Sequence, residues 1–594
     1  MTYQAPVNDI ALALETAAGL SNLIESGIAE GVDEDLVNAI VEEAGKFAAE
    51  ELAPLNAVGD TQGASLEDGK VRLPEGWAEM YNNWAAGGWA ALPCPTEFGG
   101  QGLPSVISTA VNEIWSTANL AFSLGPLLTQ GAIHAVHAKA TDELKQMFLP
   151  KLVNGEWAGT MNLTEPHAGT DLGALRTKAV PQADGTYLIS GTKIFITYGD
   201  HEMTENIAHL VLARLPDAPA GTRGISLFVV PKFLINEDGS LGERNDVYCT
   251  GVEHKLGIHA SPTCVLSFGD NGGAVGYLIG EENKGLAVMF IMMNAARLGV
   301  GIQGVAIGEA ATQKAIAYAN ERRQGSTTQS PAGQMVPIVE HPDVRRNLLT
   351  MKALTAAARA ICYATAREID ISERASDADE RAKAAYRAAL LTPVAKAYST
   401  DLAVEVASIG VQVHGGMGYI EETGAAQYLR DARILPIYEG TNGVQSIDLV
   451  TRKLPIERGE VVKGFIAELN QIVADVKASN APGFDVMANN LDAANKALER
   501  ATVWIGQKVM SSPDEALAGA TPYLRLFGIA SGGAYLAKAA LAASRKANGA
   551  AAGPVELAKF YAGNISVQAD GYARTITDGG ASLLEAPADM FAAS

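Results

Sequence analysis

One carboxylate in this chain is placed where it could act as a base. Glu439 lies in the segment I-L-P-I-Y-E-G-T-N-G-V-Q, with apolar residues before it and Gly440 and Thr441 directly after it. Water solvates a charge poorly in such a setting, so burial penalises the carboxylate form and raises its pKa toward neutrality. That pKa suits a general base. The alternative is an ordinary glutamate at a helix end, held in an ion pair.

Two further segments could bind phosphate. The first is Q-V-H-G-G-M-G, beginning at Gln412, whose glycines let the backbone approach a phosphate closely. Glycines in such a run also commonly end a helix. The second is Y-A-N-E-R-R-Q-G, beginning at Tyr318, at the end of a predicted helix. Its Arg322 could pair with a phosphate through two hydrogen bonds, or it could complement the helix dipole.

Two segments in the first half of the chain could face a redox ring. The segment M-N-L-T-E-P-H-A-G-T-D, from Met161 to Asp171, passes from an extended stretch into a glycine turn with hydroxyls and free N–H groups. Such a turn can direct donors at the edge of a flavin, or it can be an N-capping turn. The segment G-T-K-I-F-I-T, from Gly191, lies on a predicted strand, and its alternation by itself predicts only a packed Phe195.

The elements that must position these residues follow a helical, β, helical order. Apolar residues at three-to-four spacing predict helices up to about residue 160 and again from about 286. Between them, short β-prone runs alternate with turn residues, and Asp184-Gly185 and Asn271-Gly272-Gly273 are typical of hairpins. The predicted helices are Ile10–Leu23, Leu36–Leu52, Trp77–Trp89, Ser105–Phe122, Leu144–Leu152, Leu286–Asn320, Val344–Ile371 and Ala382–Ile409. The predicted strands are Tyr187–Ser190, Lys193–Thr197, His209–Ala213, Ile225–Pro231 and Thr263–Phe268.

Two stretches carry no chemistry of their own. The charged stretch Ile371–Lys383 is expected to be a solvated connection or an exposed helix end. After Pro455, an Ala-rich region predicts further helices, and we interpret it as a packed helical appendage. These helices are Val461–Ala478, Phe484–Met510 and Tyr523–Ala547.

The bulk composition excludes several classes of protein. With 594 residues, 48% hydrophobic and 19% charged, the chain is expected to be globular, with three or four structural units. Its formal net charge of −22 opposes binding to nucleic acid or to an anionic membrane. The four scattered cysteines predict reduced thiols and no metal site. Neither an export signal nor an apolar run of spanning length is visible.

The four motifs and the order of the elements resemble the acyl-CoA dehydrogenase family over about residues 40 to 455. The resemblance implies an α+β fold, mainly α, in which a helical domain, a middle β domain and a helical bundle are followed by an extra C-terminal helical domain. The domains expected on this basis are an N-terminal extension, the three family domains and a C-terminal extension, at residues 1–35, 36–158, 159–280, 281–454 and 455–594.

The resemblance also implies FAD as the cofactor and assigns residues to it. The arginine and glycine motifs hold the FAD of a neighbouring subunit in this family. The FAD contacts implied here are Met161, Leu163, Thr164, Gly169, Thr170, Phe195, Ile196, Thr197, Arg322, Gln324, Gln412, His414, Gly415, Gly416, Thr441 and Asn442. Three departures from the family pattern are visible. Tyr198 replaces an Asn or Ser, no Phe precedes Gly325, and Ala296 stands where one branch of the family carries its base.

By the same resemblance, Glu439 removes the α-proton of an acyl-CoA thioester while a β-hydride passes to FAD. The thioester carbonyl would receive hydrogen bonds from the Glu439 N–H and from the ribityl 2′-hydroxyl of FAD. The substrate contacts implied are Thr170, Asn294, Arg297, Glu439 and Gly440, although Asn294 and Arg297 could equally be ordinary polar residues on a helix.

The substrate and partners are implied by overall similarity. The length and both extensions are most similar to the branch of the family that converts 3-methylmercaptopropionyl-CoA to methylthioacryloyl-CoA during dimethylsulfoniopropionate degradation. A general short- or medium-chain acyl-CoA dehydrogenase is the alternative, and an acyl-CoA oxidase is less favoured. A DNA-binding relative and membrane attachment through Leu524–Ala547 are disfavoured, because the C-terminal region has no basic stripe. An electron-transferring flavoprotein as acceptor, a homodimer or tetramer, and a cytoplasmic location are expected.

Overall fold

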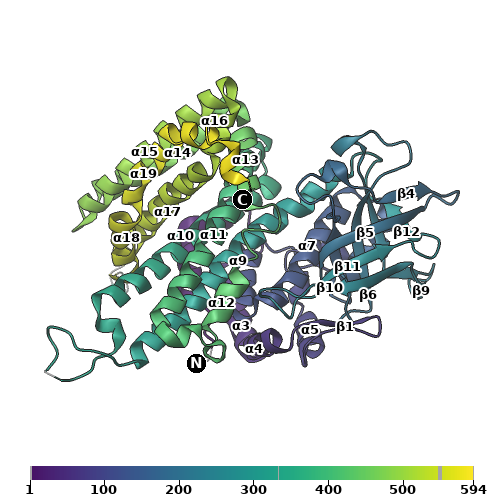
Figure 1. Cartoon of the computed structure of the whole chain (residues 1–594), viewed down its shortest axis with the longest axis horizontal. Coiled ribbons are helices and arrows are strands. Elements are labelled where there is room, and N and C mark those ends of the chain that lie inside the picture. Colours follow the sequence, from purple (N-terminus) through teal and green to yellow (C-terminus); the bar gives the residue numbers. More distant parts are fainter. Residues whose placement is uncertain (1–2, 332, 546–551, 593–594) are drawn as a thin grey trace. The chain divides into compact units, whose positions relative to one another are not determined.

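A computed structural model describes residues 3–331, 333–545 and 552–592, and the chain divides into two compact units. Unit 1 comprises Met1–Glu43, Ser105–Thr117 and Arg297–Ser594, and its named elements are helices. Unit 2 comprises Ala44–Pro104 and Ala118–Ala296 and contains the named strands (Figure 1). The predicted fold class, mainly α with a β domain between helical segments, is confirmed.

The centre of unit 2 is an eight-stranded sheet with the order β10-β11-β5-β12-β7-β6-β3, in which β4 also pairs with β5. Every position of β6 and β7 is buried, as expected for apolar strands covered on both faces. Among the named strand pairs of this sheet in the described residues, β3 and β6 run parallel and the other pairs run antiparallel. The strands are β3 (Trp157–Asn162), β4 (Lys178–Pro181), β5 (Tyr187–Thr197), β6 (Asn206–Ala213), β7 (Ser226–Pro231), β10 (Val247–Val252), β11 (Thr263–Phe268) and β12 (Ala274–Leu278).

The glycine turn at Asn271-Gly272-Gly273 does not form the predicted hairpin. The strands on either side of it, β11 and β12, both pair with β5, at Gly191–Thr197 and at Tyr187–Ile189 respectively. Because β5 is eleven residues long, it accepts both partners along its length. The Asp184-Gly185 turn does join two paired strands, β4 and β5, as predicted.

Several strands were not predicted. They are β3, which lies at one edge of the large sheet, the strands β4, β10 and β12 of the same sheet, and two small hairpins. The hairpins join β1 (Ser65–Glu67) to β2 (Lys70–Arg72) and β8 (Phe233–Ile235) to β9 (Leu241–Arg244). The strand β3, W-A-G-T-M-N, contains few β-branched residues, so its own propensity for a strand is weak. Its pairing with the buried strand β6 overrides that preference.

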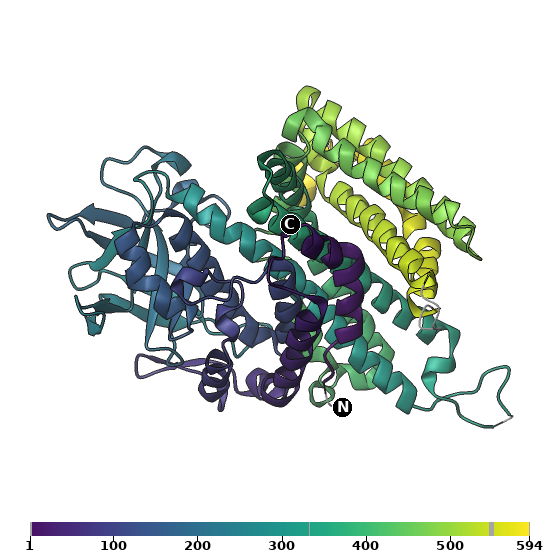
Figure 2. The ribbon, with the colours of Figure 1, turned by 180° about the vertical axis from the view of Figure 1, so that it is seen from behind.

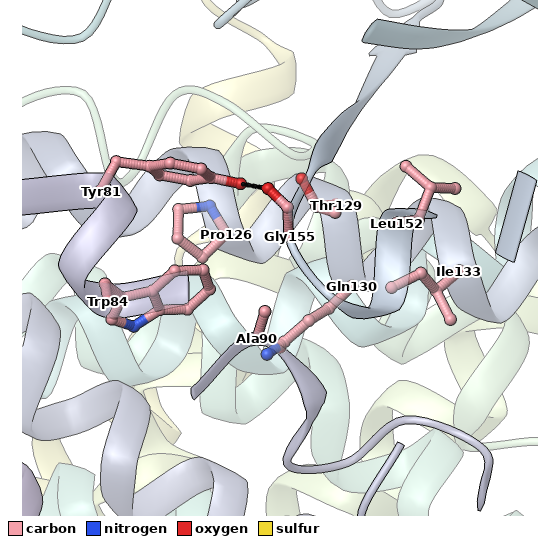
Figure 3. A pocket seen from close by; sticks show the side chains of 9 residues that line it. All are labelled: Tyr81, Trp84, Ala90, Pro126, Thr129, Gln130, Ile133, Leu152 and Gly155. Atoms are coloured by element: carbon pink, nitrogen blue, oxygen red, sulfur yellow. Dashed lines mark hydrogen bonds between the residues drawn. The ribbon is translucent and has the colours of Figure 1, made fainter. Parts of the chain in front are cut away.

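The helices of unit 2 enclose a small cavity, shown in Figure 3. It lies among α5 (Trp77–Ala86), α7 (Leu120–Lys139) and α8 (Asp142–Val153), and the Tyr81 hydroxyl at its edge donates to the Gly155 carbonyl at 2.9 Å. About 10 Å³ is open to the centre of a water molecule, which is room for one water and far too little for an acyl chain. Trp84 Nε1, buried without a partner in the described part of the chain, could bind that water. The remaining helix, α4, spans Ala53–Gln62.

The long helices of unit 1 before residue 455 are α9 (Gly285–Glu321, from Arg297 onward), α10 (Pro342–Arg374) and α11 (Ala378–His414). Its other helices before residue 455 are α1 (Val7–Ala13), α2 (Leu20–Glu25), α3 (Glu34–Phe47, up to Glu43), α6 (Ser105–Ala118), α12 (Ala425–Ala432) and α13 (Asn442–Asp448). Figure 2 shows the N-terminal helices in purple, and the segment Leu14–Ala18 packs against α10.

Buried charges join the helices of unit 1. Arg359 on α10 contacts Glu113 of α6 at 2.7 Å and Glu309 of α9 at 2.9 Å. Asp370 of α10 accepts from the N–H groups of Ser105 and Val106 at 2.5 and 2.9 Å, so it caps α6. The charged stretch Ile371–Lys383 consists mostly of helix ends, which was one of the two structures expected for it. α10 ends at Arg374 and α11 begins at Ala378.

The region after Pro455 is a set of packed helices, as predicted, and they belong to unit 1. The helix α17 packs against α10 and α11. Arg525 of α17 pairs with Glu405 at 2.8 Å and lies 5.3 Å from the centre of the Tyr398 ring, and the Tyr398 hydroxyl bonds that of Tyr561 at 2.8 Å. The helices are α14 (Glu460–Ala478), α15 (Phe484–Ser511), α16 (Pro513–Ala518), α17 (Ala520–Ser544), α18 (Ala552–Asn564), α19 (Ala569–Asp578) and α20 (Gly580–Leu584). The predicted helical residues 546 and 547 lie outside the described part of the chain.

Two glycine-to-alanine substitutions test this packing. A Cβ at Gly528 of α17 would lie 2.3 Å from the Tyr398 ring, whereas a Cβ at Gly506 of α15 meets nothing within 4 Å. We expect Gly528→Ala to lower the free energy of unfolding by about 1–3 kcal/mol through overpacking. Gly506→Ala should raise it by up to about 1 kcal/mol, because Ala favours a helix over Gly. Thermal unfolding of both variants measures this, and equal shifts would contradict the close contact.

Two helices in the described part of the chain are long and apolar enough to cross a membrane by length and composition alone. They are Gly285–Glu321 and Ala520–Ser544, and 56% and 89% of their most apolar windows are buried within the protein. A helix in the core of a globular protein has the same composition, so these helices are weak evidence for a membrane span.

All four cysteines are buried and unbridged.

Candidate active site

The backbone around Glu439 has an unusual conformation. After α12 the chain runs through a loop and enters α13 at Asn442, with Thr441 as the N-cap, whose Oγ1 accepts from the Val444 N–H at 3.3 Å. Glu439 and Gly440 have φ angles of 55° and 83°. The left-handed region suits glycine but is uncommon for a glutamate, at a cost of roughly 1–3 kcal/mol. Surrounding contacts must therefore hold this turn.

Those contacts come from α11 and α13. Lys396 of α11 is fully buried, and its ammonium donates to the Gly440 carbonyl at 3.0 Å and to Asn442 Oδ1 at 2.8 Å. The Asn442 amide in turn donates to the Ala397 carbonyl, at 3.1 Å. Gln445 Nε2 donates to the carbonyls of Glu439 and Gly440 at 3.3 and 3.4 Å. The turn is thus held by side chains of both α11 and α13.

The Glu439 carboxyl titrates near neutrality. Burial raises the pKa of Glu439 to about 7, although the positive charges of Arg297 and Lys396 oppose that rise. Arg297, on α9, is itself buried, and burial lowers its pKa while Asp448 and Glu439 raise it. A carboxylate with a pKa of about 7 can take a proton at neutral pH. The loop therefore presents a base next to two cations.

Unit 2 holds the T-E-P motif onto strand β5 through a buried ion pair. Lys193 Nζ contacts Glu165 Oε1 at 2.9 Å and donates to the Leu163 carbonyl at 2.9 Å. Glu165 also accepts from the Thr177 hydroxyl at 2.6 Å, and these partners lower its pKa even though burial acts in the opposite direction. Burial lowers the pKa of Lys193 to about 8. Glu165 and Lys193 thus brace this loop.

The residues predicted to contact the flavin ring lie near the Glu165–Lys193 ion pair in sequence. Gly169 and Thr170 are exposed, and Met161, Leu163 and Thr164 are half-buried. On β5 the register with β11 shifts between Lys193 and Ile196, which is a β-bulge, and within it Phe195 has a φ of 60° and is 58% exposed. A bulge redirects a side chain, so Phe195 faces outward rather than into the core. Thr197 is half-buried, whereas the Ile196 side chain packs in the hydrophobic core.

Tyr198, which replaces the family's Asn or Ser, has a structural role. Its hydroxyl donates to the Ala121 carbonyl at 2.8 Å and accepts from Trp77 Nε1 at 3.2 Å. Tyr198 is buried, and like Phe195 it has a positive φ, of 50°. The residue therefore ties the end of β5 to the helices of unit 2.

The glycine motif begins where α11 ends. The His414 ring is buried and stacks on Tyr318 with ring centres 4.5 Å apart, and its Nδ1 bonds the Gly410 carbonyl at 2.7 Å. Gly415 and Gly416 are exposed, and a Cβ at either would meet nothing within 4 Å. Their backbone is therefore open to a ligand, while the run also ends the helix.

The other predicted residues are placed as follows. Arg322, Gln324, Gln412 and Thr441 are exposed in unit 1, where Arg322 directly follows the end of α9. Asn294 is exposed on α9 in unit 2, three residues before Arg297. The Asn442 side chain is buried, and its polar atoms bond residues of α11. Sequence reasoning missed Lys396, Gln445, Glu165 and Lys193, although a lysine within the small and apolar stretch of α11 could have indicated burial.

Four family models match this chain along most of its length. They are the N-terminal, middle and C-terminal domains of acyl-CoA dehydrogenases at residues 35–156, 160–271 and 283–454, and an acetyl-CoA dehydrogenase C-terminal like domain at residues 465–587. The arrangement and its motifs define a flavin-dependent oxidoreductase that acts on CH–CH groups. The chain belongs to the acyl-CoA dehydrogenase family.

Individual relatives agree with this assignment. The chain is 47% identical to 3-methylmercaptopropionyl-CoA dehydrogenase of Ruegeria pomeroyi over 99% of this chain and 100% of that one. It is 38% identical to a butyryl-CoA dehydrogenase of Syntrophomonas wolfei, over 77% of each chain. The structure of Caenorhabditis elegans ACDH-11 in complex with C11-CoA, 22% identical, shares the fold with a TM-score of 0.79 over 94% of this chain and 91% of that one.

The cofactor of this family is FAD, and the residues present are compatible with it. Unit 2 offers an outward-facing aromatic ring at Phe195 and the hydroxyl of Thr170, which is exposed. Unit 1 offers the open backbone of Gly415 and Gly416 and the exposed guanidinium of Arg322, groups suited to a pyrophosphate. No side chain in the described structure fills the space above the two glycines.

Proposed function

We propose that this enzyme oxidises 3-methylmercaptopropionyl-CoA to methylthioacryloyl-CoA, with Glu439 as the base, as a step in dimethylsulfoniopropionate degradation. The observation that carries the substrate is the 47% identity, over essentially the whole of both chains, with an enzyme of that name. Both extensions are included in that match, whereas the butyryl-CoA dehydrogenases match over less of the chain. The base is supported by the pKa of Glu439, which burial raises to about 7.

The chain's own residues support the following chemistry. Glu439 removes the α-hydrogen of the thioester as a proton, and the two electrons of that C–H bond form the new double bond. The main-chain N–H of Glu439 makes no hydrogen bond within the described residues, so it can donate to the thioester carbonyl and stabilise enolate character. Arg297 orients the carboxylate, and Thr170 contacts the acyl end. The β-hydrogen would leave with its electron pair as hydride, and FAD held by the assigned residues would supply the acceptor.

The remaining contacts and partners belong to the same proposal. The FAD contacts are the sixteen residues assigned by sequence, with Ile196 and Asn442 contributing through their main chains. Asn294 and Gly440 complete the acyl-CoA site. We propose a homodimer in the cytoplasm, because the glycine and arginine motifs serve a neighbouring subunit in the family. The acceptor is an electron-transferring flavoprotein, as the resemblance to the family implies.

Anaerobic titration of the yellow holoenzyme with a panel of acyl-CoA esters tests the substrate. We expect 3-methylmercaptopropionyl-CoA to bleach the flavin at least about 10-fold more efficiently than butyryl-CoA or octanoyl-CoA. The butyryl-CoA relatives, at 38% and 36% identity, make a general short-chain preference the second candidate. Equal bleaching by butyryl-CoA would favour that candidate, and rapid peroxide formation in air would indicate an oxidase.

A further inference from the structure

The most unusual charge outside the assigned residues is the ammonium of Lys396. Its side chain has no exposed surface, and within the described structure no carboxylate lies within 4.0 Å of it. Burying an ammonium without a counter-charge in contact is costly, so such lysines are rare unless they have a specific partner. Here the partners are two neutral oxygens, the Gly440 carbonyl at 3.0 Å and Asn442 Oδ1 at 2.8 Å.

Both oxygens belong to the turn that carries Glu439. The Gly440 carbonyl directly follows the pair of left-handed residues, and Asn442 begins α13. The Asn442 amide donates to three groups on the helix of Lys396: the Ala397 carbonyl at 3.1 Å, Thr400 Oγ1 at 2.9 Å and Asp401 Oδ1 at 2.7 Å. α11 therefore holds the turn by hydrogen bonds at Gly440 and at Asn442, one and three residues after Glu439. Lys396 donates a hydrogen bond at both positions.

The charges around Lys396 come from several helices. Burial lowers the pKa of Lys396 to about 7, with Arg297 of α9 acting in the same direction, while Glu439 and Asp401 raise it. Lys396 and Arg297 both lower the pKa of Glu439. The groups that act on these residues from neighbouring elements are Arg433 and Arg525 on Asp401, and Asp448 and Arg452 on Arg297. Lys396 is thus one of two cations whose charge acts on Glu439.

We propose that Lys396 is a positioning residue for proton abstraction: its ammonium holds the Gly440 carbonyl and the Asn442 side chain, which fixes the turn that presents Glu439, and its charge stabilises the carboxylate form of Glu439. Lys396 touches no reacting atom and exchanges no proton in the reaction. The α-proton moves to Glu439, and Lys396 stays as it was. This inference rests on the proposed role of Glu439 as the base.

Two substitutions separate the hydrogen bonds from the charge. Lys396→Met removes both, whereas Lys396→Gln keeps an amide donor for the two oxygens but removes the charge. The measurement is the rate of anaerobic flavin reduction in the holoenzyme by 3-methylmercaptopropionyl-CoA or butyryl-CoA, from pH 5.5 to 9. Lys477→Met, at an exposed position on α14, is the matched control.

We expect Lys396→Met to reduce its flavin about 100-fold more slowly near pH 7, as misplacement of a catalytic group does. The acidic limb of its pH–rate profile should also move to higher pH, because the loss of a nearby cation raises the pKa of Glu439. Lys396→Gln should recover most of the rate at high pH while its acidic limb stays shifted. Lys477→Met should match the wild-type protein.

An unchanged acidic limb in both variants would overturn the proposal, and so would a Gln variant as slow as Met at every pH. If Lys396→Met does not retain FAD, the Lys396→Gln variant still tests the proposal, through the position of the acidic limb of its pH–rate profile. Failure of the proposed function looks different, because the wild-type protein would then reduce its flavin with none of the esters, whatever residue stands at 396.

Discussion

Glu439→Gln is expected to retain FAD and to bind acyl-CoA but to lose flavin reduction by at least about 10³-fold, within the range for removal of a general base. Glutamine has nearly the same shape and can occupy the same left-handed backbone, so the hydrogen bonds from Lys396 and Gln445 to the turn should survive. Only the group that accepts the proton is lost. Anaerobic stopped-flow reduction gives the rate, and the flavin spectrum with added ligand reports binding.

The pH dependence gives this experiment a second readout. Because burial raises the pKa of Glu439 to about 7, its carboxylate form is depleted below that pH. Wild-type kcat/KM should therefore rise with pH through about 7 and level off above it. The matched control is Glu457→Gln, at an exposed glutamate that also has a positive φ, of 48°. Near-normal bleaching of the flavin in Glu439→Gln would exclude Glu439 as the base.

Arg359→Met is expected to cost about 3–5 kcal/mol of stability, because it leaves buried carboxylates without their cation. Arg359 bonds Glu113 at 2.7 Å and Glu309 at 2.9 Å, and the Tyr363 hydroxyl donates to Glu113 at 2.9 Å. These residues come from α6, α9 and α10, so one substitution loosens three helices at once. The midpoint of thermal or urea unfolding, followed at pH 8, measures the loss.

Two further measurements identify the cause of that loss. Burial raises the pKa of Glu113 even in the presence of Arg359, so the folded form of the variant should bind protons more tightly than the unfolded chain. The loss should therefore shrink as the pH falls from 8 toward 5. Restoring an apolar cluster with Glu113→Leu and Glu309→Leu should recover much of the stability. An Arg359→Met variant with wild-type unfolding at pH 8 would contradict this account.

The helical, β, helical order was predictable because local periodicity reports it. Helices such as α14 and α15 bury one face, so their apolar residues recur at helical spacing. β3 was missed because its residues have little preference for a strand. Its partner β6 lies about fifty residues further along the chain, beyond the reach of any local pattern. The false hairpin at Asn271-Gly272-Gly273 has the same origin, since a turn signal does not say which strand the next segment will join.

The candidate site divides in the same way. Glu439, Phe195 and Gly415 were recognisable from contiguous motifs. Lys396 and Asn442 act through contacts with residues more than forty positions apart in sequence, which no local pattern encodes. Glu165 and Lys193 were part of recognised motifs, but only their 2.9 Å contact assigns them to bracing the loop.

The sequence by itself determined the reaction class, because the residues that do the chemistry sit in short segments whose order and spacing are written along the chain. It also located the carboxylate at Glu439 and the Ala296 that excludes a rival base. Tertiary structure alone decided why that carboxylate titrates near pH 7. Burial, the cations of Arg297 and Lys396 and the left-handed turn all depend on three helices meeting at one loop. The burial of a side chain and its distance to other charges depend on the fold, so the pKa of Glu439 is set only when the chain folds.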